Sequence, residues 1–177
     1  MKYAILFFSA FVGIVLQDTV FNVISIAEGK PDFVLILVVF YALFHGPVQG
    51  GILGVVFGLM EDLMTGRFIG LNAICKGLTG FVIGILSERL YKNNFTIPVL
   101  TVFLSTFLQS VIYLLCGALI GLNLEGVRLM MVSISDAVYN IVFSPVFYAA
   151  FYHFYASRRL IAMKTQTNHP TLGTLTA

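Results

Sequence analysis

The sequence has little charge: Asp, Glu, Lys and Arg make up 10% of its 177 residues, against roughly 25% in an ordinary soluble domain. It has no tryptophan and two cysteines, whereas hydrophobic residues make up 59% of the chain. A water-soluble fold is therefore excluded. The ten basic and eight acidic residues form no basic stripe, which argues against a nucleic-acid partner. A chain of this length holds about six membrane-spanning helices and no separate catalytic domain.

Apolar runs separated by charged or helix-breaking residues predict six spans. Their ranges are 3–26, 33–45, 47–62, 69–87, 97–122 and 129–156. The second and third reach only about 20 Å each, so they either cross a thin region of membrane or form a re-entrant hairpin. A cleaved signal peptide is the competing interpretation of the first run, although Asp18 interrupts it. The sequence predicts an all-α integral membrane protein, with one six-helix transmembrane domain over residues 1–163.

The basic residues are divided unevenly between the two sides of this bundle. The side that holds both termini carries six of them: Lys2, Arg89, Lys92, Arg158, Arg159 and Lys164. The opposite side carries Lys30, Arg67 and Arg128. Because positive loops stay in the cytoplasm, both termini are predicted to be cytoplasmic. Residues 164–177 are polar and rich in threonine, which predicts a disordered cytoplasmic tail.

A glycine ladder marks the third span. Its members recur at every fourth position: Gly46, Gly50, Gly54 and Gly58. Residues at this spacing share one helix face, and small-residue faces let membrane helices approach closely. We interpret the face as packing within the chain, with a partner protein as the alternative. A complementary face on the fourth span would consist of Ala73, Gly77 and Gly84, with Gly80 nearby.

Three ionisable residues fall inside predicted spans, where each costs a few kcal/mol unless it is paired or faces a cavity. They are Asp18, Lys76 and Asp136, each roughly 10 to 12 Å below the outer surface. We expect Lys76 to be neutralised by one or two of Asp18, Asp62 and Asp136. A structural ion pair is the favoured interpretation. The alternative is an outer cavity that admits a small ligand or a segment of a partner.

Other chemical signatures are scarce. Cys75 and Cys116 both fall in apolar stretches, where a thiol usually behaves as a small buried hydrophobe, so no disulfide is expected. The three histidines lack metal-ligand spacing, and no nucleophile motif is present. The sequence therefore predicts no catalytic residue, no cofactor and no metal.

One ordered string of residues is more specific than composition. It consists of Pro31-Asp32, Gly46-Pro47, Gly50, Gly54, Gly58-Leu59-x-x-Asp62, Gly66 and Gly70-Leu71-Asn72-Ala73. In order and spacing it resembles the rod shape-determining protein family MreD. The resemblance implies a non-enzymatic component of the bacterial elongation machinery in the cell membrane. Its implied partners are MreC, MreB, the wall glycosyltransferase and transpeptidase, and membrane lipid. The resemblance is also compatible with a homodimer.

The resemblance leaves two functions to compare. In the first, the chain is a scaffold, and the residues of the string support the bundle or its contact with MreC. The MreD family is also similar in fold to the S-components of energy-coupling-factor vitamin transporters. In the second, the chain is therefore an S-component, whose outer cavity binds a small vitamin-like molecule. Composition and topology do not separate the two.

Overall fold

The regular structure is helical throughout the part of the chain that the computed structural model describes. That part comprises residues 13–15, 17, 29–66, 68–87, 96–122 and 125–167, with side chains described up to residue 149. Its helices are α2 (Phe33–His45), α3 (Pro47–Thr65), α4 (Leu71–Leu86), α5 (Thr96–Leu119) and α6 (Gly126–Thr167). Residues 13–15 and 17, within the first predicted span, are also helical.

α6 is longer than the sequence indicated. The sixth span was predicted over 129–156, whereas α6 begins at Gly126 and continues to Thr167. The first four residues of the predicted disordered tail, 164–167, are therefore helical. The remainder of that tail lies outside the described residues. Charged and polar residues after 156 suggested an end, but no glycine or proline follows until Pro170, so nothing local stops the helix there.

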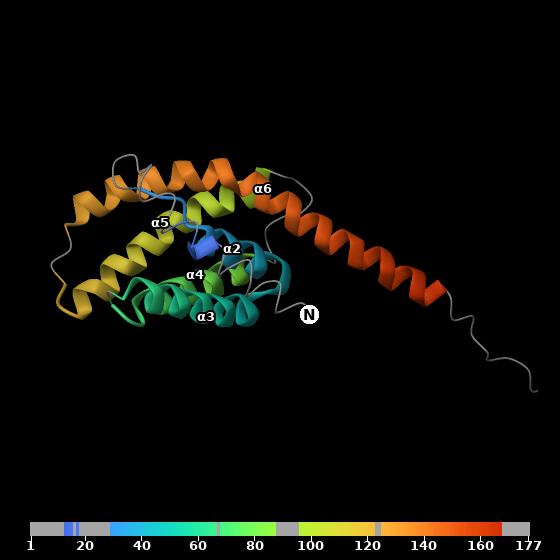
Figure 1. Cartoon of the computed structure of the whole chain (residues 1–177), viewed down its shortest axis with the longest axis horizontal. Coiled ribbons are helices and arrows are strands. Elements are labelled where there is room, and N and C mark those ends of the chain that lie inside the picture. The colour runs from blue at the N-terminus through green and yellow to red at the C-terminus, as the bar shows by residue number, and fades with distance from the viewer. Residues whose placement is uncertain are drawn as a thin grey trace, which may run out of the picture.

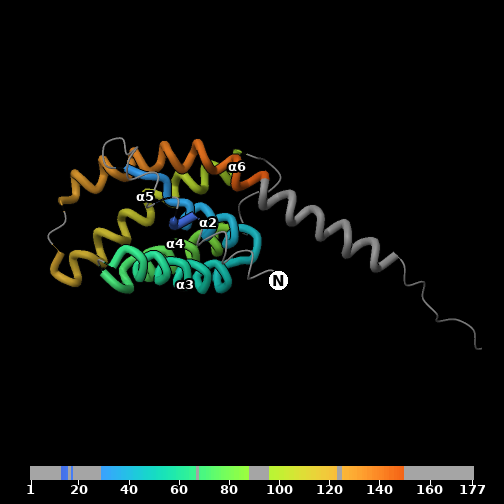
Figure 2. The backbone as a smooth tube through the Cα atoms, in the orientation of Figure 1, coloured from blue at the N-terminus to red at the C-terminus, as the bar shows by residue number. Residues whose placement is uncertain are grey.

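α2 is the central element of the bundle. Every residue from Phe33 to Leu43 is buried, because α2 contacts α3, α4, α5 and α6. Figures 1 and 2 show it between the α3–α4 pair below and the α5–α6 pair above. This explains why its sequence is apolar on all faces, as is typical of a fully buried helix. Pro31 and Asp32 are buried too, so α2 begins inside the protein.

The turn between α2 and α3 depends on Gly46. Its φ of 91° lies in the region that L side chains rarely adopt, and a Cβ built there would meet nothing within 4 Å. Pro47 then starts α3, where its missing N–H would be unpaired in any case. Gly46 therefore serves the turn rather than the close-packed glycine face to which the sequence analysis assigned it.

The other three ladder glycines bring α3 against the backbone of α4. A Cβ at Gly50 would lie 2.8 Å from the Gly80 carbonyl oxygen, and one at Gly54 would lie 2.6 Å from the Lys76 carbonyl carbon. A Cβ at Gly58 would lie 2.7 Å from the Ala73 Cα. The face therefore packs within the chain, against the helix that the sequence analysis proposed as its complement. Helices meet this closely only where side chains are absent.

The outer faces of the helices carry apolar side chains. Among the described residues, three helical segments are long and apolar enough to cross a membrane: Pro47–Thr65, Thr96–Leu119 and Gly126–Ala149. α2 and α4 are shorter apolar helices. Large side chains such as Ile52 on α3, Leu104 on α5 and Val142 on α6 are more than half exposed. Such a surface suits the hydrocarbon core of a bilayer.

The glycine packing predicts that Gly54→Ala destabilises the protein whereas Gly51→Ala does not. The new methyl at Gly54 collides with the α4 backbone, which has no flexible atom to move aside, so we expect a loss of about 1 to 3 kcal/mol. At Gly51 the nearest atom to a new Cβ is 3.4 Å away, and alanine favours the helix. Thermal unfolding of both variants in detergent, followed by circular dichroism, measures the difference. Equal midpoints would contradict the proposed packing.

Candidate functional site

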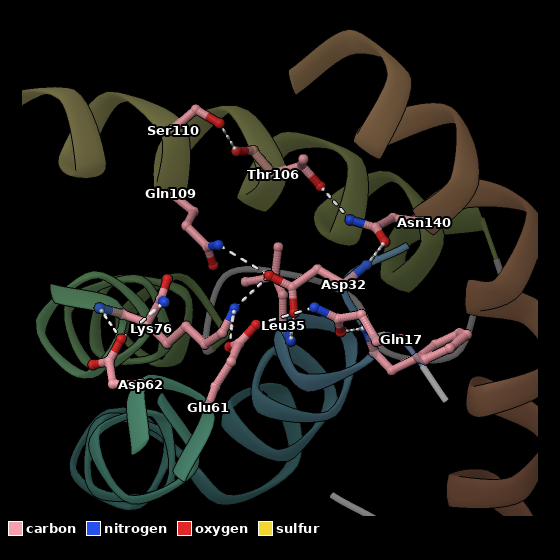
Figure 3. Close-up of polar contacts among 12 residues, drawn as sticks. Gln17, Asp32, Leu35, Glu61, Asp62, Lys76, Thr106, Gln109, Ser110 and Asn140 are labelled. Carbon is pink, nitrogen blue, oxygen red and sulfur yellow. Dashed lines mark hydrogen bonds and ion pairs between the residues drawn. The ribbon is translucent and has the colours of Figure 1, made fainter. Parts of the chain in front are cut away.

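A fully buried lysine lies at the centre of the bundle. Lys76, near the middle of α4, has no exposed surface. Its Nζ forms ion pairs with Asp32 Oδ2 and with Glu61 Oε2, the second at 3.1 Å. Figure 3 shows the two carboxylates converging on the ammonium group. One cation thereby joins α4 to the start of α2 and to the end of α3.

Asp32 has several partners besides Lys76. Its Oδ1 accepts a hydrogen bond of 2.7 Å from the Leu35 N–H, so it is the N-cap of α2. Its Oδ2 accepts a second bond, of 3.0 Å, from Gln109 Nε2 on α5. The positive end of the α2 dipole also favours a negative charge at this position. Asp32 is therefore held by a helix terminus, a cation and an amide together.

Side-chain amides complete the cluster. Gln17 donates from Nε2 to Glu61 Oε1 at 3.0 Å, and its oxygen accepts from the Phe33 N–H at 3.3 Å. Asn140, on α6, accepts from the Asp32 N–H at 2.8 Å and donates to Thr106 Oγ1 on α5 at 3.0 Å. An amide offers both a donor and an acceptor. It can therefore link a backbone N–H to a side chain on another helix (Figure 3).

The positive and negative charges of the cluster partly offset one another. One ammonium and two carboxylates, from Lys76, Asp32 and Glu61, give a formal charge of +1 − 2 = −1 when all are ionised. The N-terminus of α2 adds a partial charge of roughly +0.5 beside Asp32. Buried charges are tolerated only when they are paired and hydrogen-bonded. Here Asp32 and Glu61 each combine an ion pair to Lys76 with an amide hydrogen bond.

Asp62 forms a second polar contact, at the start of α4. Its Oδ2 accepts from the backbone N–H groups of Gly70 at 2.9 Å and Ala73 at 3.1 Å. Its Oδ1 accepts from the Asn72 backbone N–H at 3.2 Å and from Asn72 Nδ2 at 2.9 Å. The α4 N-cap is Gly70, which has no side chain to cap with. The carboxylate on α3 therefore caps α4 from outside that helix.

The turn between these two helices needs glycine at both ends. Gly66 ends α3 with a φ of 65°, and Gly70 precedes α4 with a φ of 98°. A Cβ at either position would meet nothing within 4 Å, so backbone conformation rather than space selects glycine. The turn brings the backbone N–H groups of Gly70 and Ala73 to the Asp62 carboxylate. Gly66 and Gly70 therefore allow the hydrogen bonds that Asp62 accepts.

Two of the three predicted partners of Lys76 have other contacts. Asp62 caps α4, and Asp136 Oδ1 accepts a 2.7 Å hydrogen bond from the Lys30 N–H, so Asp136 fixes the segment that leads into α2. Asp18, the third predicted partner, lies outside the described residues. The sequence analysis did not name Asp32 or Glu61 as a partner of Lys76, because it judged depth by counting residues from predicted helix ends. α2 begins within the bundle, so that count misplaced its first residue.

Sequence reasoning missed the amides altogether. Gln17, Gln109 and Asn140 each fall inside an apolar run that was predicted to span the membrane. An amide in such a position must find hydrogen-bond partners, because lipid offers none. Amide residues within apolar runs were therefore a visible sign of a buried polar cluster. The sequence does not say which amide contacts which charged group.

The family comparison agrees with this geometry. The model of the family described as rod shape-determining protein MreD matches residues 1–158. The chain belongs to the MreD family. This is a family of bacterial inner-membrane proteins that determine rod shape, and it is not a known enzyme family. No sequence among the curated proteins and no solved structure matches the chain.

The residues of the MreD-like string have distinct positions in the fold. Asp32 caps α2 and pairs with Lys76, and Gly50, Gly54 and Gly58 bring α3 onto α4. Asp62, Gly66 and Gly70 build the α3–α4 turn. In this MreD chain the string therefore describes how three consecutive helices are joined. Asp32, Asp62 and the three glycines of α3 are all buried.

The ion-pair cluster predicts that Lys76→Met destabilises this MreD protein by about 3 to 5 kcal/mol, because it leaves two buried carboxylates without a cation. Adding Asp32→Asn and Glu61→Gln removes those charges and keeps an oxygen at each position. We expect the triple variant to recover part of the loss. Thermal unfolding and accumulation in the membrane provide the measurements. A Lys76→Met protein as stable as the parent would refute the structural role of the pair.

The cap at α4 predicts a separate effect for Asp62→Asn. An amide nitrogen would then face one or more N–H groups, so at least one hydrogen bond becomes a repulsive contact. We expect a loss of about 1 to 3 kcal/mol. Glu125→Gln is the matched control, because Glu125 is exposed and surface changes usually stay within about 0.5 kcal/mol. If both variants unfold at the parent temperature, Asp62 is not the cap that holds α4.

Proposed function

We propose that this protein is a non-enzymatic scaffold of the rod complex that binds MreC and, through that complex, works with MreB and the wall glycosyltransferase and transpeptidase. The carrying observation is the MreD family match over residues 1–158. The internal geometry supports it, because the buried charges serve one another rather than a reaction centre. Cell shape and lateral wall synthesis then depend on the surfaces that the bundle presents.

The structure favours an apolar contact with MreC. Gly50, Gly54 and Gly58 are occupied by α4, and Asp32 and Asp62 are occupied by helix starts. They support the bundle, so they are poor candidates for direct contact with a partner. The large exposed side chains of α3, α5 and α6 remain. Such faces suit either lipid or a single membrane-spanning helix, and MreC is expected to supply a helix of that kind.

We also propose that both termini lie in the cytoplasm, on the strength of the basic-residue asymmetry. In that orientation the start of α4 and the end of α5 face the outer side of the membrane. The α3–α4 turn at Gly66–Gly70 faces the same side.

A transporter S-component is the alternative function. It would hold a small molecule in the outer half of the bundle. In this chain the polar side chains nearest the middle contact one another, so a ligand would have to displace Lys76, Gln109 or Gln17 from existing partners. That requirement favours the scaffold.

Purification from native membranes in gentle detergent tests the proposal. We expect MreC, the wall transpeptidase or its glycosyltransferase to be recovered with the protein and identified by mass spectrometry. Photo-crosslinking side chains placed singly at Ile52, Leu104 and Val142 would then report which helix face contacts MreC. Recovery of a transmembrane coupling protein with two ATPases would overturn the scaffold and support the S-component.

A further inference from the structure

The turn between α3 and α4, at one end of that helix pair in Figure 1, has apolar side chains on its outside. Ile69 is 70% exposed and Phe68 is 44% exposed, although both lie in the connection between the helices. Arg67, which precedes them, lies outside the described residues. Turns that stand in water are usually polar. The two exposed side chains therefore suit lipid better than water.

The apolar surface continues along α3. Leu59, Leu63 and Met64, in the second half of that helix, are also exposed. Thr65 is an exposed polar residue in the same stretch, but its hydroxyl donates to the Glu61 carbonyl at 2.8 Å. α3 is long and apolar enough to cross a membrane, and the family is one of inner-membrane proteins. The turn thus extends a surface that already suits the bilayer.

Backbone N–H groups at the turn have partners within the chain. A helix start leaves its first N–H groups unpaired, and these normally bind water or a cap. Here three of the four N–H groups from Gly70 to Ala73 donate to the Asp62 carboxylate, at 2.9 to 3.2 Å. The fourth, that of Leu71, donates to the Phe68 carbonyl at 3.3 Å. The start of α4 therefore does not depend on water, which is the condition for lying in lipid.

Helix length limits how far the turn reaches. α3 has 19 residues and α4 has 16, which correspond to about 28 Å and about 24 Å. The hydrocarbon core of a bilayer is about 30 Å thick, and the polar layers bring the total to about 40 to 45 Å. An α3 helix that begins at the inner edge of the hydrocarbon therefore ends at its outer edge. A turn that stood in water would need longer helices.

We propose that the α3–α4 turn inserts Phe68 and Ile69 into the outer leaflet, at the level where phospholipid headgroups meet acyl chains. The proposal rests on the orientation proposed above, in which this turn faces the outer side. Large apolar side chains buried at that level hold a segment at a fixed depth. Lipid thereby sets the depth of Asp62 and of the helix start that it caps. The proposal goes beyond the scaffold function, because phospholipid rather than a protein covers this end of the hairpin.

Tryptophan fluorescence tests the depth of the turn. The chain has no tryptophan, so one introduced by Phe68→Trp reports alone. The full-length variant is reconstituted in vesicles of phosphatidylglycerol and phosphatidylcholine, with bromine on the phosphatidylcholine chains either near the headgroup or near the chain end. We expect strong quenching by bromine near the headgroup, weaker quenching by bromine near the chain end, and little quenching by iodide on both sides of the membrane. Ile69→Trp, at the more exposed position, should give the same pattern.

Two further positions calibrate the result. Leu59→Trp lies within α3, so bromine near the chain end should quench it most. Glu125→Trp replaces an exposed residue between α5 and α6, so iodide should quench it most. If Phe68→Trp and Ile69→Trp behave like Glu125→Trp, the turn stands in water and the proposal fails. If neither bromine nor iodide quenches them, protein covers the turn, which also overturns the proposal.

Cysteine labelling tests the turn in its native membrane, in a Cys75→Ser, Cys116→Ser background. A membrane-impermeant maleimide applied to intact spheroplasts should label Glu125→Cys and leave Ile69→Cys unlabelled, because the reacting species is a thiolate, which lipid disfavours. Equal labelling of the two would contradict the proposal. Labelling of Ile69→Cys only in cells that lack MreC would mean that MreC covers the turn, which overturns it too.

The same assay separates this proposal from the others. An unlabelled Glu125→Cys refutes the orientation and the outer leaflet together. Recovery of MreC remains the test of the scaffold, and the lipid proposal can fail while that test succeeds.

Discussion

The rest of the structure depends on the buried N-terminus of α2. A helix start leaves backbone N–H groups without partners, and in a membrane protein no water is present to satisfy them. Here the Leu35 N–H donates to Asp32, and the Phe33 N–H donates to Gln17. Burying a carboxylate at this position then requires a cation nearby, which Lys76 supplies. The charged cluster therefore follows from where α2 begins.

The glycine contacts between α3 and α4 allow Lys76 to reach both of its carboxylate partners. Gly54 meets the backbone at Lys76, so α3 and α4 touch at the level of the ion pair. With larger residues there, α4 would move away from α3, and Lys76 would no longer reach both Glu61 on α3 and Asp32 at the start of α2. The same close approach carries Asp62 to the start of α4. Backbone packing and polar contacts are thus parts of one arrangement.

The sequence predicted the helix contacts that follow from helical periodicity. It missed the contacts that depend on how deep each residue lies in the bundle. The spacing of Gly50, Gly54 and Gly58 identified a contact face and its complement on α4, because helical period is a local property. Asp32 and Glu61 were not foreseen as partners of Lys76, because their position depends on where α2 starts relative to other helices. Gly46 matched the period but serves a turn, which only its φ reveals.

A scaffold needs outer faces that keep fixed positions relative to one another. Apolar packing alone specifies this poorly in a bilayer, since lipid is as apolar as the helix surfaces and little hydrophobic force selects one register. Directional contacts do select one: Asn140 joins α6 to the start of α2 and to α5, and Lys76 joins α4 to α3. A helix that slid by one turn would leave charges or amides unpaired within the bundle. The polar cluster therefore sets the geometry of the apolar faces, and in the proposed scaffold role it would influence partners without touching them.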